Sequence, residues 1–360
     1  MAKTKLLMSG NEAIAAGAMQ AGCTFYAGYP ITPQNELIAY MAVHLPDAGG
    51  VFIQAESELA AINMVFGASA AGVRAMTSSS SPGMSLKQEG ISYIAGAELP
   101  AVIVNIMRGG PGLGNIAPAQ SDYFQATRGG GHGDYHSIVL APSSVQESYD
   151  FMALAFDLAD QYRIPVIVLG DGMLGQMMEP LRCSAETRNP KPLPAGRQGA
   201  TRKPWTLTGC KGRKSNVIRS FCLAEGELES LNLKLQEKYC QIRKKEQRYE
   251  TTCLDDAEMV LVAYGSMSRI TKAAVNRLRA EGKKIGLIRP VTLWPFPEQV
   301  LTKLITRKKL PRILVVEMSH GQMIEDVKLA VKGKMPVDFL GRAGGGIPSE
   351  EEIIKKVIAL

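Results

Sequence analysis

Short apolar runs alternate along the chain with longer segments in which small and apolar residues recur at helical spacing. Six runs in the first half are largely apolar instead of alternating with polar residues: 25–29, 51–54, 74–78, 101–107, 137–141 and 165–169. Such runs are typical of parallel strands covered on both faces. Helical patterns lie between them, at 11–22, 33–43, 57–72, 84–97 and 143–161. The alternation predicts an α/β fold with a doubly wound, mainly parallel sheet.

A second block repeats this alternation. Its expected strands are 259–263, 284–288, 312–316 and 336–340, and its expected helices are 267–281, 296–306, 320–333 and 349–359. Residues 182–215 between the blocks are rich in proline and glycine, and residues 225–250 show helical spacing of apolar positions. We therefore predict a first doubly wound domain at 1–181, a linker with a basic insert and a connecting helix at 182–255, and a second doubly wound domain at 256–360.

The charge is concentrated in the linker. Nine Lys or Arg and a single acid lie in residues 182–214, so this segment accounts for more than the whole net charge of +7. A local basic insert does not form a charged face, and we expect no nucleic-acid partner. Because no apolar run approaches about 18 residues and no signal sequence is evident, we expect no membrane partner and a cytoplasmic protein.

Two sequence patterns exclude some cofactors. The stretch from Arg108 to Gly114 lacks the G-x-G-x-x-G spacing and opens no helix, which argues against an NAD-binding dehydrogenase. The six cysteines contain no C-x-x-C pair, so an iron–sulfur cluster would have to lie on another chain. No His or Cys spacing indicates a metal site.

Polar residues follow several expected strands at the point where each strand ends. Glu58 begins a helical segment, Arg108 ends a strand, and 77–83 supplies hydroxyls. Thr32 precedes Pro33, which predicts a helix N-cap with proline at the first helical position. α/β sheets bind ligands at their carboxyl edge, where an arginine can clamp a carboxylate. Each residue also has a purely structural explanation, as a helix cap or a loop charge.

Several longer strings are distinctive. They are Gly-Asn-Glu-Ala (10–13), Tyr-Pro-Ile-Thr-Pro (29–33), Gln-Ala-Glu-Ser-Glu (54–58), Thr-Ser-Ser-Ser-Ser-Pro-Gly (77–83), the Glu-Gly-Ile-Ser-Tyr segment (89–100), Gln-Ser-Asp-Tyr-Phe-Gln-Ala (120–126) and Arg-Pro-Val-Thr-Leu-Trp-Pro-Phe-Pro (289–297). Together these strings resemble the alpha subunit of 2-oxoacid:ferredoxin oxidoreductases. They are most similar to the branched-chain 2-oxoisovalerate type, and the pyruvate and 2-oxoglutarate types come next.

The resemblance implies roles for particular residues. Glu58 would hydrogen-bond the aminopyrimidine ring of thiamine diphosphate and favour the imino tautomer that removes the thiazolium proton. Thr32 and Arg108 would hold the carbonyl and carboxylate of a 2-oxoacid. Further cofactor-binding residues would be Pro30, Ile31 and Ser80. The first domain would be a pyrimidine-binding domain and the second a transketolase C-terminal-like domain.

The resemblance also implies an enzyme that is active only with partner subunits. Gly170-Asp171-Gly172 resembles the opening of the thiamine-diphosphate metal motif but lacks its later Asn pair, so we interpret it as a strand-to-loop turn. Mg²⁺ and diphosphate would then lie on a beta subunit, and iron–sulfur clusters on gamma and ferredoxin-like subunits. The reaction would decarboxylate a 2-oxoacid, 3-methyl-2-oxobutanoate being favoured, to an acyl-CoA, with coenzyme A as cosubstrate and electrons passing to ferredoxin. Pyruvate or 2-oxoglutarate remain alternative substrates, and a non-catalytic assembly subunit is an alternative of another class. The insert near 194–203 is longer and more basic than the resemblance implies.

Overall fold

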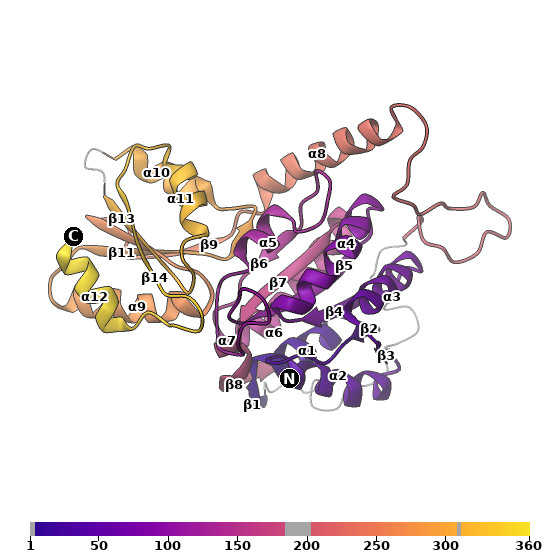
Figure 1. Cartoon of the computed structure of the whole chain (residues 1–360), viewed down its shortest axis with the longest axis horizontal. Coiled ribbons are helices and arrows are strands. Elements are labelled where there is room, and N and C mark those ends of the chain that lie inside the picture. The colour runs from indigo at the N-terminus through magenta and orange to yellow at the C-terminus, as the bar shows by residue number, and fades with distance from the viewer. Residues whose placement is uncertain (1–3, 184–202, 308–310) are drawn as a thin grey trace.

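The computed structural model describes residues 4–183, 203–307 and 311–360 and shows two α/β units joined by a long helix (Figure 1). Most of the basic insert predicted near 194–203 lies outside the described residues. The first unit contains β1 (Thr4–Ser9), α1 (Gly10–Gln20), β2 (Phe25–Gly28), α2 (Asn35–Asp47), β3 (Val51–Gln54), α3 (Glu58–Ala70), β4 (Ala75–Ser79), α4 (Ser81–Gly96), β5 (Ala101–Met107), α5 (Tyr123–Arg128), β6 (Ile138–Leu140), α6 (Val145–Tyr162), β7 (Pro165–Asp171), α7 (Gly172–Gln176) and β8 (Met178–Cys183).

The second part of the chain begins with the connecting helix. It contains α8 (Glu227–Lys245), β9 (Tyr249–Thr252), β10 (Met259–Val262), α9 (Gly265–Ala280), β11 (Ile285–Pro290), β12 (Thr292–Trp294), α10 (Glu298–Ile305), β13 (Arg312–Glu317), α11 (Met323–Val331), β14 (Val337–Gly341) and α12 (Glu350–Ala359).

A seven-stranded sheet in the order β12-β6-β7-β5-β4-β2-β3 forms the centre of the first unit. Its strands are parallel except β12, which pairs antiparallel with β6. Strands β5 and β7 are buried along their whole length, as expected for strands covered on both faces. The apolar runs thus predicted the core of this sheet, but β12 comes from the part of the chain that we assigned to the second domain.

Helices cover both faces of this sheet. Helix α1 packs on α2 and α6, and α3 packs on α4. The chain passes from β2 to its neighbour β3 on one side and then returns past β2 to β4 on the other. Right-handed crossovers in opposite directions place α2 and α3 on opposite faces. The sheet therefore has a topological switch point at β2, where α/β sheets open a crevice at their carboxyl edge.

The second unit is built on a five-stranded sheet in the order β14-β13-β10-β11-β9, with β9 antiparallel. Helix α9 packs on α12 and α10 packs on α11. Alternate residues of β10 join different cores: Met259 and Leu261 pack with the α9–α12 side, while Val260 and Val262 belong to the core that extends into the first unit. This two-residue period follows from the pleat of a strand. The structure is therefore doubly wound in both units, as predicted.

Buried hydrogen bonds connect the two units. The backbone N–H of Gln120 donates to Met318 O at 2.9 Å, and the side chain of Gln120 accepts from Met318 N at 3.0 Å. The Nε2 of Gln120 also donates to Tyr264 O at 3.0 Å. Tyr123, in the next turn of the chain, donates its hydroxyl to Asp326 Oδ2 at 2.6 Å. Segment 120–126 was noted in the sequence analysis only for its family resemblance. In the structure it provides the main polar contact with the second unit.

Several expected boundaries are wrong. Helix α2 begins at Asn35 with Gln34 as N-cap, so Thr32 is not a helix cap and Pro33 is not in the first turn. Asp171 ends β7 and caps α7 by accepting from Met173 N and Leu174 N, so this turn leads from a strand into a helix and not into a loop. The short strands β1, β8, β9 and β12 were not predicted, because each has only three to six residues and lacks a continuous apolar run. No helix within the described residues is long and apolar enough to cross a membrane.

Candidate functional site

The loops that carry the predicted site residues meet at the carboxyl edge of the seven-stranded sheet. Strands β3, β2, β4 and β5 are parallel neighbours, so their carboxyl ends lie at the same edge. The six residues predicted for the site directly follow these strands: Pro30, Ile31 and Thr32 after β2, Glu58 after β3, Ser80 after β4 and Arg108 after β5. They therefore surround the switch point, the place where α/β sheets commonly bind ligands.

Glu58 is held at the first turn of α3 and is only 6% exposed. Ser57 caps this helix by accepting from Ala60 N at 3.1 Å, which fixes where the helix starts. Gly83 of α4 faces the carboxylate: a Cβ at this position would lie 2.4 Å from Glu58 Oε1 and 2.1 Å from Ser79 Oγ. Only glycine leaves room for the side chain of Glu58 against α4. The helix N-terminus also favours a carboxylate at this position.

A buried lysine lies beside this carboxylate. Lys87 of α4 has no exposed surface, and its Nζ donates to Thr77 Oγ1 of β4 at 3.1 Å. Burial lowers the pKa of Lys87 to about 8, and the charge of Glu58 acts in the opposite direction. The sequence analysis did not select Lys87. The sequence could have indicated it, because Lys87 lies at helical spacing from the apolar residues Ile91 and Ile94, four and seven positions later, and so on the buried face of the helix.

Arg108 and Thr32 are brought together by the fold. Arg108 is 7% exposed, and its guanidinium donates to Thr32 O at 2.9 Å and to Leu113 O at 3.0 Å. Its Nε is buried and has no acceptor among the described residues. The hydroxyl of Thr32 accepts from Asn35 Nδ2 at 3.3 Å. Arg108 therefore anchors two loops at the carboxyl edge of the sheet. The roles of Arg108 and Thr32 toward a substrate stay predictions.

Buried polar atoms without partners gather at the same edge. Within the described residues, they include Ser79 Oγ, Ser80 Oγ, Gln34 Nε2 and Asn105 Oδ1. Buried polar groups in proteins are normally hydrogen-bonded, so these atoms are free to bind water or a polar ligand. Gln34 is oriented by Ser78, which donates to its Oε1 at 2.6 Å. Hydroxyl and amide groups beside a buried carboxylate suit a heteroaromatic ring that both donates and accepts hydrogen bonds.

Asp122 is a further buried acid that the sequence analysis missed. Ser81 Oγ donates to its Oδ2 at 2.6 Å and Asn105 Nδ2 donates at 2.9 Å. Burial raises the pKa of Asp122, while these two hydrogen bonds lower it in part. Ser81 Oγ also accepts the N–H of Arg108 at 3.0 Å. Asp122 thus joins the ends of β4 and β5 to the segment that contacts the second unit, which no local sequence pattern could reveal.

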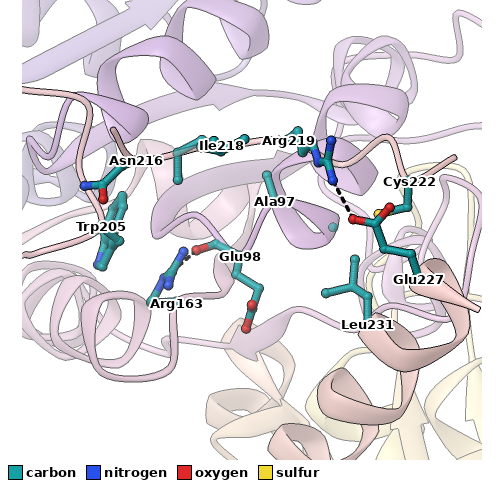
Figure 2. Close-up of a pocket in the computed structure, with 12 residues that line it drawn as sticks. Ala97, Glu98, Arg163, Trp205, Asn216, Ile218, Arg219, Cys222, Glu227 and Leu231 are labelled. Carbon is teal, nitrogen blue, oxygen red and sulfur yellow. Dashed lines mark hydrogen bonds and ion pairs between the residues drawn. The ribbon is translucent and has the colours of Figure 1, made fainter. Parts of the chain in front are cut away.

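A hollow elsewhere on the first unit does not belong to this site. Figure 2 shows a cavity of about 330 Å³ between the loop after α4, segment 205–222 and the start of α8. Arg163 lies over the ring of Trp205 at 4.6 Å and donates to Glu98 O at 2.8 Å, and Arg219 pairs with Glu227 at 2.5 Å. The carboxylate of Glu98 pairs with Lys234 and Lys238 of α8. Because the charged groups around the cavity already have partners, we interpret it as a packing seam beneath segment 205–222.

No group of three His, Cys, Asp or Glu in the described parts of the chain could hold a metal ion. The carboxyl edge holds the carboxylates of Glu58 and Asp122 together with the hydroxyl and amide groups described above. Asp171, the acid of the Gly-Asp-Gly stretch, points instead toward the second unit, where Ser266 Oγ donates to its Oδ2. A buried carboxylate with hydroxyl and amide neighbours fits the hydrogen-bonding groups of a pyrimidine ring.

Comparisons with known proteins identify the family of this chain. A family model described as "Pyruvate flavodoxin/ferredoxin oxidoreductase, thiamine diP-bdg" matches residues 16–214, and one described as "Pyruvate:ferredoxin oxidoreductase core domain II" matches residues 257–353. Ketoisovalerate oxidoreductase subunit VorB of Methanothermobacter marburgensis is 50% identical over 351 residues, which are 98% of this chain and 96% of VorB. The 2-oxoglutarate synthase subunit KorA of Methanocaldococcus jannaschii is 40% identical over 365 residues, 98% of each chain.

Solved structures show the same fold. A 2-oxoglutarate:ferredoxin oxidoreductase from Magnetococcus marinus, with 2-oxoglutarate, coenzyme A and succinyl-CoA bound, has a TM-score of 0.85 at 28% identity; the match covers 99% of this chain and 65% of that longer chain. A split-gene transketolase has a TM-score of 0.57 at 13% identity, covering 97% of this chain and 96% of its own, and shows the fold alone. These matches confirm the expected fold class and the family resemblance. Because the first family model covers more than half of the chain and VorB and KorA relatives span almost all of it, the chain belongs to the thiamine-diphosphate-dependent 2-oxoacid:ferredoxin oxidoreductases, as an alpha-type subunit of a multi-subunit enzyme.

Proposed function

We propose that this chain supplies the pyrimidine half of a shared thiamine-diphosphate site in an enzyme that converts 3-methyl-2-oxobutanoate to an acyl-CoA and passes electrons to ferredoxin. The substrate is suggested by the name of the relative that is 50% identical over 98% of the chain, a ketoisovalerate oxidoreductase subunit. Coenzyme A as cosubstrate is supported by the related structure with coenzyme A bound. We place the enzyme in the cytoplasm.

The single observation that carries the proposal is the buried carboxylate of Glu58 at the carboxyl edge, with Gly83 leaving room for it. Thiamine diphosphate supplies an electron sink for cleavage of the bond between the carboxylate and the carbonyl carbon of a 2-oxoacid. Glu58 would hold a proton at a ring nitrogen of the coenzyme through one carboxylate oxygen. Pro30, Ile31 and Ser80 would line the ring, and the free hydroxyl of Ser80 is available to hydrogen-bond it.

Arg108 and Thr32 would position the substrate. The guanidinium of Arg108 is a fixed positive charge beside the crevice, and its Nε–H has no acceptor within the described chain, so it can receive a carboxylate oxygen. Thr32 is held next to it through its carbonyl, at 2.9 Å from the guanidinium. We place Mg²⁺ and diphosphate on a beta subunit and the iron–sulfur clusters on gamma and ferredoxin-like subunits, because the described residues contain no metal-binding group.

The test is activity of the co-expressed enzyme with a panel of 2-oxoacids, coenzyme A and a viologen acceptor. We expect the highest kcat/KM with the branched-chain acid. Glu58→Gln should lower kcat by roughly two to four orders of magnitude, because it removes the proton-holding group. Glu56→Gln is the matched control, since Glu56 is an exposed acid two residues earlier on the same loop. Near-normal turnover by the Glu58→Gln enzyme would refute the assigned role, and a preference for pyruvate or 2-oxoglutarate would refute the substrate.

A further inference from the structure

Lys87 is a buried cation whose presence the fold alone does not explain. Its side chain has no exposed surface, and among the described residues its Nζ has one hydrogen-bond acceptor, Thr77 Oγ1 at 3.1 Å. An ammonium group can donate three hydrogen bonds and is costly to remove from water. An apolar residue would satisfy the packing of α4 against the sheet without that cost. A lysine at this position therefore suggests a use for its charge.

Lys87 lies on the face of α4 that meets Glu58. Gly83 and Lys87 are four residues apart on α4, so they lie on the same face of the helix. A Cβ on Gly83 would lie 2.4 Å from Glu58 Oε1, which places the carboxylate against this face. One turn beyond Lys87 the helices are equally close, because a Cβ on Gly90 would lie 2.5 Å from Ile62 Cγ2 of α3. Lys87 thus lies along the seam between α3 and α4 that begins at Glu58.

No other charge acts comparably on Lys87 in the described parts of the chain. Glu58 is the charged group that raises its pKa, against the larger lowering by burial. Glu89, the acid next to it on α4, is exposed and accepts from the hydroxyl of Tyr93 at 2.5 Å. On β4, the neighbour of the ammonium is the uncharged Thr77. The pair of Lys87 and Glu58 is therefore an isolated buried pair of opposite charges without the direct contact of a salt bridge.

We propose that Lys87 is a positioning residue whose positive charge acts on the Glu58 side chain and shifts the proton shared between Glu58 and the coenzyme toward the ring nitrogen. The proton leaves a carboxyl oxygen of Glu58 and binds the ring nitrogen, and no electrons are transferred. Because Gly83, on the same face of α4 as Lys87, meets the Glu58 carboxylate, the positive charge of Lys87 would stabilise a negative charge on that carboxylate. This inference rests on the proposed role of Glu58.

A competing explanation is that Lys87 only supports the packing of α4 through Thr77. In that case its replacement would change stability but not the position of the proton. Thr77→Val distinguishes the two explanations, because it removes the acceptor hydroxyl and leaves both charges in place. A structural role predicts similar effects of Thr77→Val and Lys87→Met. A role through charge predicts that only Lys87→Met moves the proton.

The experiment uses the assembled enzyme loaded with thiamine diphosphate that is ¹⁵N-labelled at the pyrimidine ring nitrogen, without a 2-oxoacid. The ¹⁵N chemical shift reports the fraction of ring nitrogen that is protonated. In Lys87→Met the ratio of protonated to unprotonated ring should fall by about tenfold relative to the wild type, as expected for loss of one nearby charge. Thr77→Val should give nearly the wild-type shift.

The wild-type enzyme provides a test that needs no variant. When the pH is raised until Lys87 loses its proton, the ring nitrogen should lose protonation in the same step. A ring signal that does not change through that step, or equal signals in wild type and Lys87→Met, would overturn the inference about Lys87. Glu58→Gln separates this failure from failure of the proposed function: an unchanged ring signal in Glu58→Gln would refute the role of Glu58 itself.

Discussion

Replacing Gly83 by alanine would test whether the position of Glu58 matters for the reaction. The added Cβ would lie 2.1 Å from Ser79 Oγ, 2.4 Å from Glu58 Oε1 and 2.9 Å from Glu58 Cγ. Ordinary contacts between such atoms are about 3.5 Å, so the carboxylate would have to move by about 1 Å. The Ser79 hydroxyl can rotate away, but the carboxylate of Glu58 is buried and has little room. Glu58 must therefore leave its present position.

Two effects of different size follow from this displacement. Overpacking of a buried site costs about 1–3 kcal/mol of folding free energy, which a chain of this size tolerates. A displacement of about 1 Å at a reacting group can lower the rate by about 100-fold. We therefore expect Gly83→Ala to assemble normally, to bind thiamine diphosphate more weakly and to lower kcat by about 100-fold.

The assay is viologen reduction by the co-expressed enzyme, together with urea unfolding of each variant. Gly67→Ala is the control, because Gly67 lies on the exposed side of α3 and a Cβ there meets no atom within 4 Å. Alanine at an exposed helical glycine should stabilise the protein by about 0.5–1 kcal/mol without affecting turnover. If Gly83→Ala retained full turnover while Gly67→Ala behaved as expected, our account of the Glu58 position would be wrong.

Two further predictions concern charges at the same edge. Arg108→Ala should raise KM and lower kcat together, so that kcat/KM falls by about 100-fold, because the change removes the positive charge and releases the loop at Thr32. A change in KM alone would show that Arg108 only binds substrate. Burial lowers the pKa of Lys87 from its ordinary 10.5 to about 8 in the folded chain. Between these two pH values the unfolded chain binds more protons than the folded chain. The free energy of unfolding should therefore rise with pH from about 8 to 10.5. Lys87→Met should lose this rise, and at pH 7 its free energy of unfolding, measured in urea, should exceed that of the wild type by roughly 3 kcal/mol. If the variant kept the wild-type pH profile, Lys87 could not be the buried charge responsible for it.

The sequence predicted the fold well where burial imposes a pattern. Strands β5 and β7 are buried throughout and were visible as continuous apolar runs. Helix α8 was visible from its apolar spacing, and Leu235, Tyr239 and Ile242 are indeed buried, although Leu228 at the start of the pattern is 51% exposed. Strand β12 was missed because its three residues carry no period of their own and its partner lies about 150 residues away.

The site was predictable only in part. Glu58 and Arg108 share an edge because each follows a parallel strand, and the alternation of strands and helices along the chain was enough to expect this. The failed N-cap at Thr32 shows why local rules fall short: this loop is fixed by Arg108, 76 residues later, and not by its own helix. The contacts of Lys87 with Thr77 and of Asp122 with Ser81 likewise depend on which helix packs on which strand. Such pairings are set by tertiary structure, which a single sequence does not encode locally.

The return of β12 to the first sheet has a consequence for dissecting this protein. A fragment that ended at residue 255 would include the whole first domain that the sequence predicts, but its sheet would stop at β6 with unpaired backbone groups along that strand. The ring of His136, which stacks on Trp294 at 4.4 Å, would lose its cover, as would Tyr239 of α8, whose ring meets Trp294 edge-on at 5.7 Å. An uncovered strand beside exposed aromatic rings promotes aggregation. The first half produced alone would thus self-associate. In a chimera that exchanges second halves between relatives, residues 292–294 would have to come from the same protein as the first sheet, because they form its last strand.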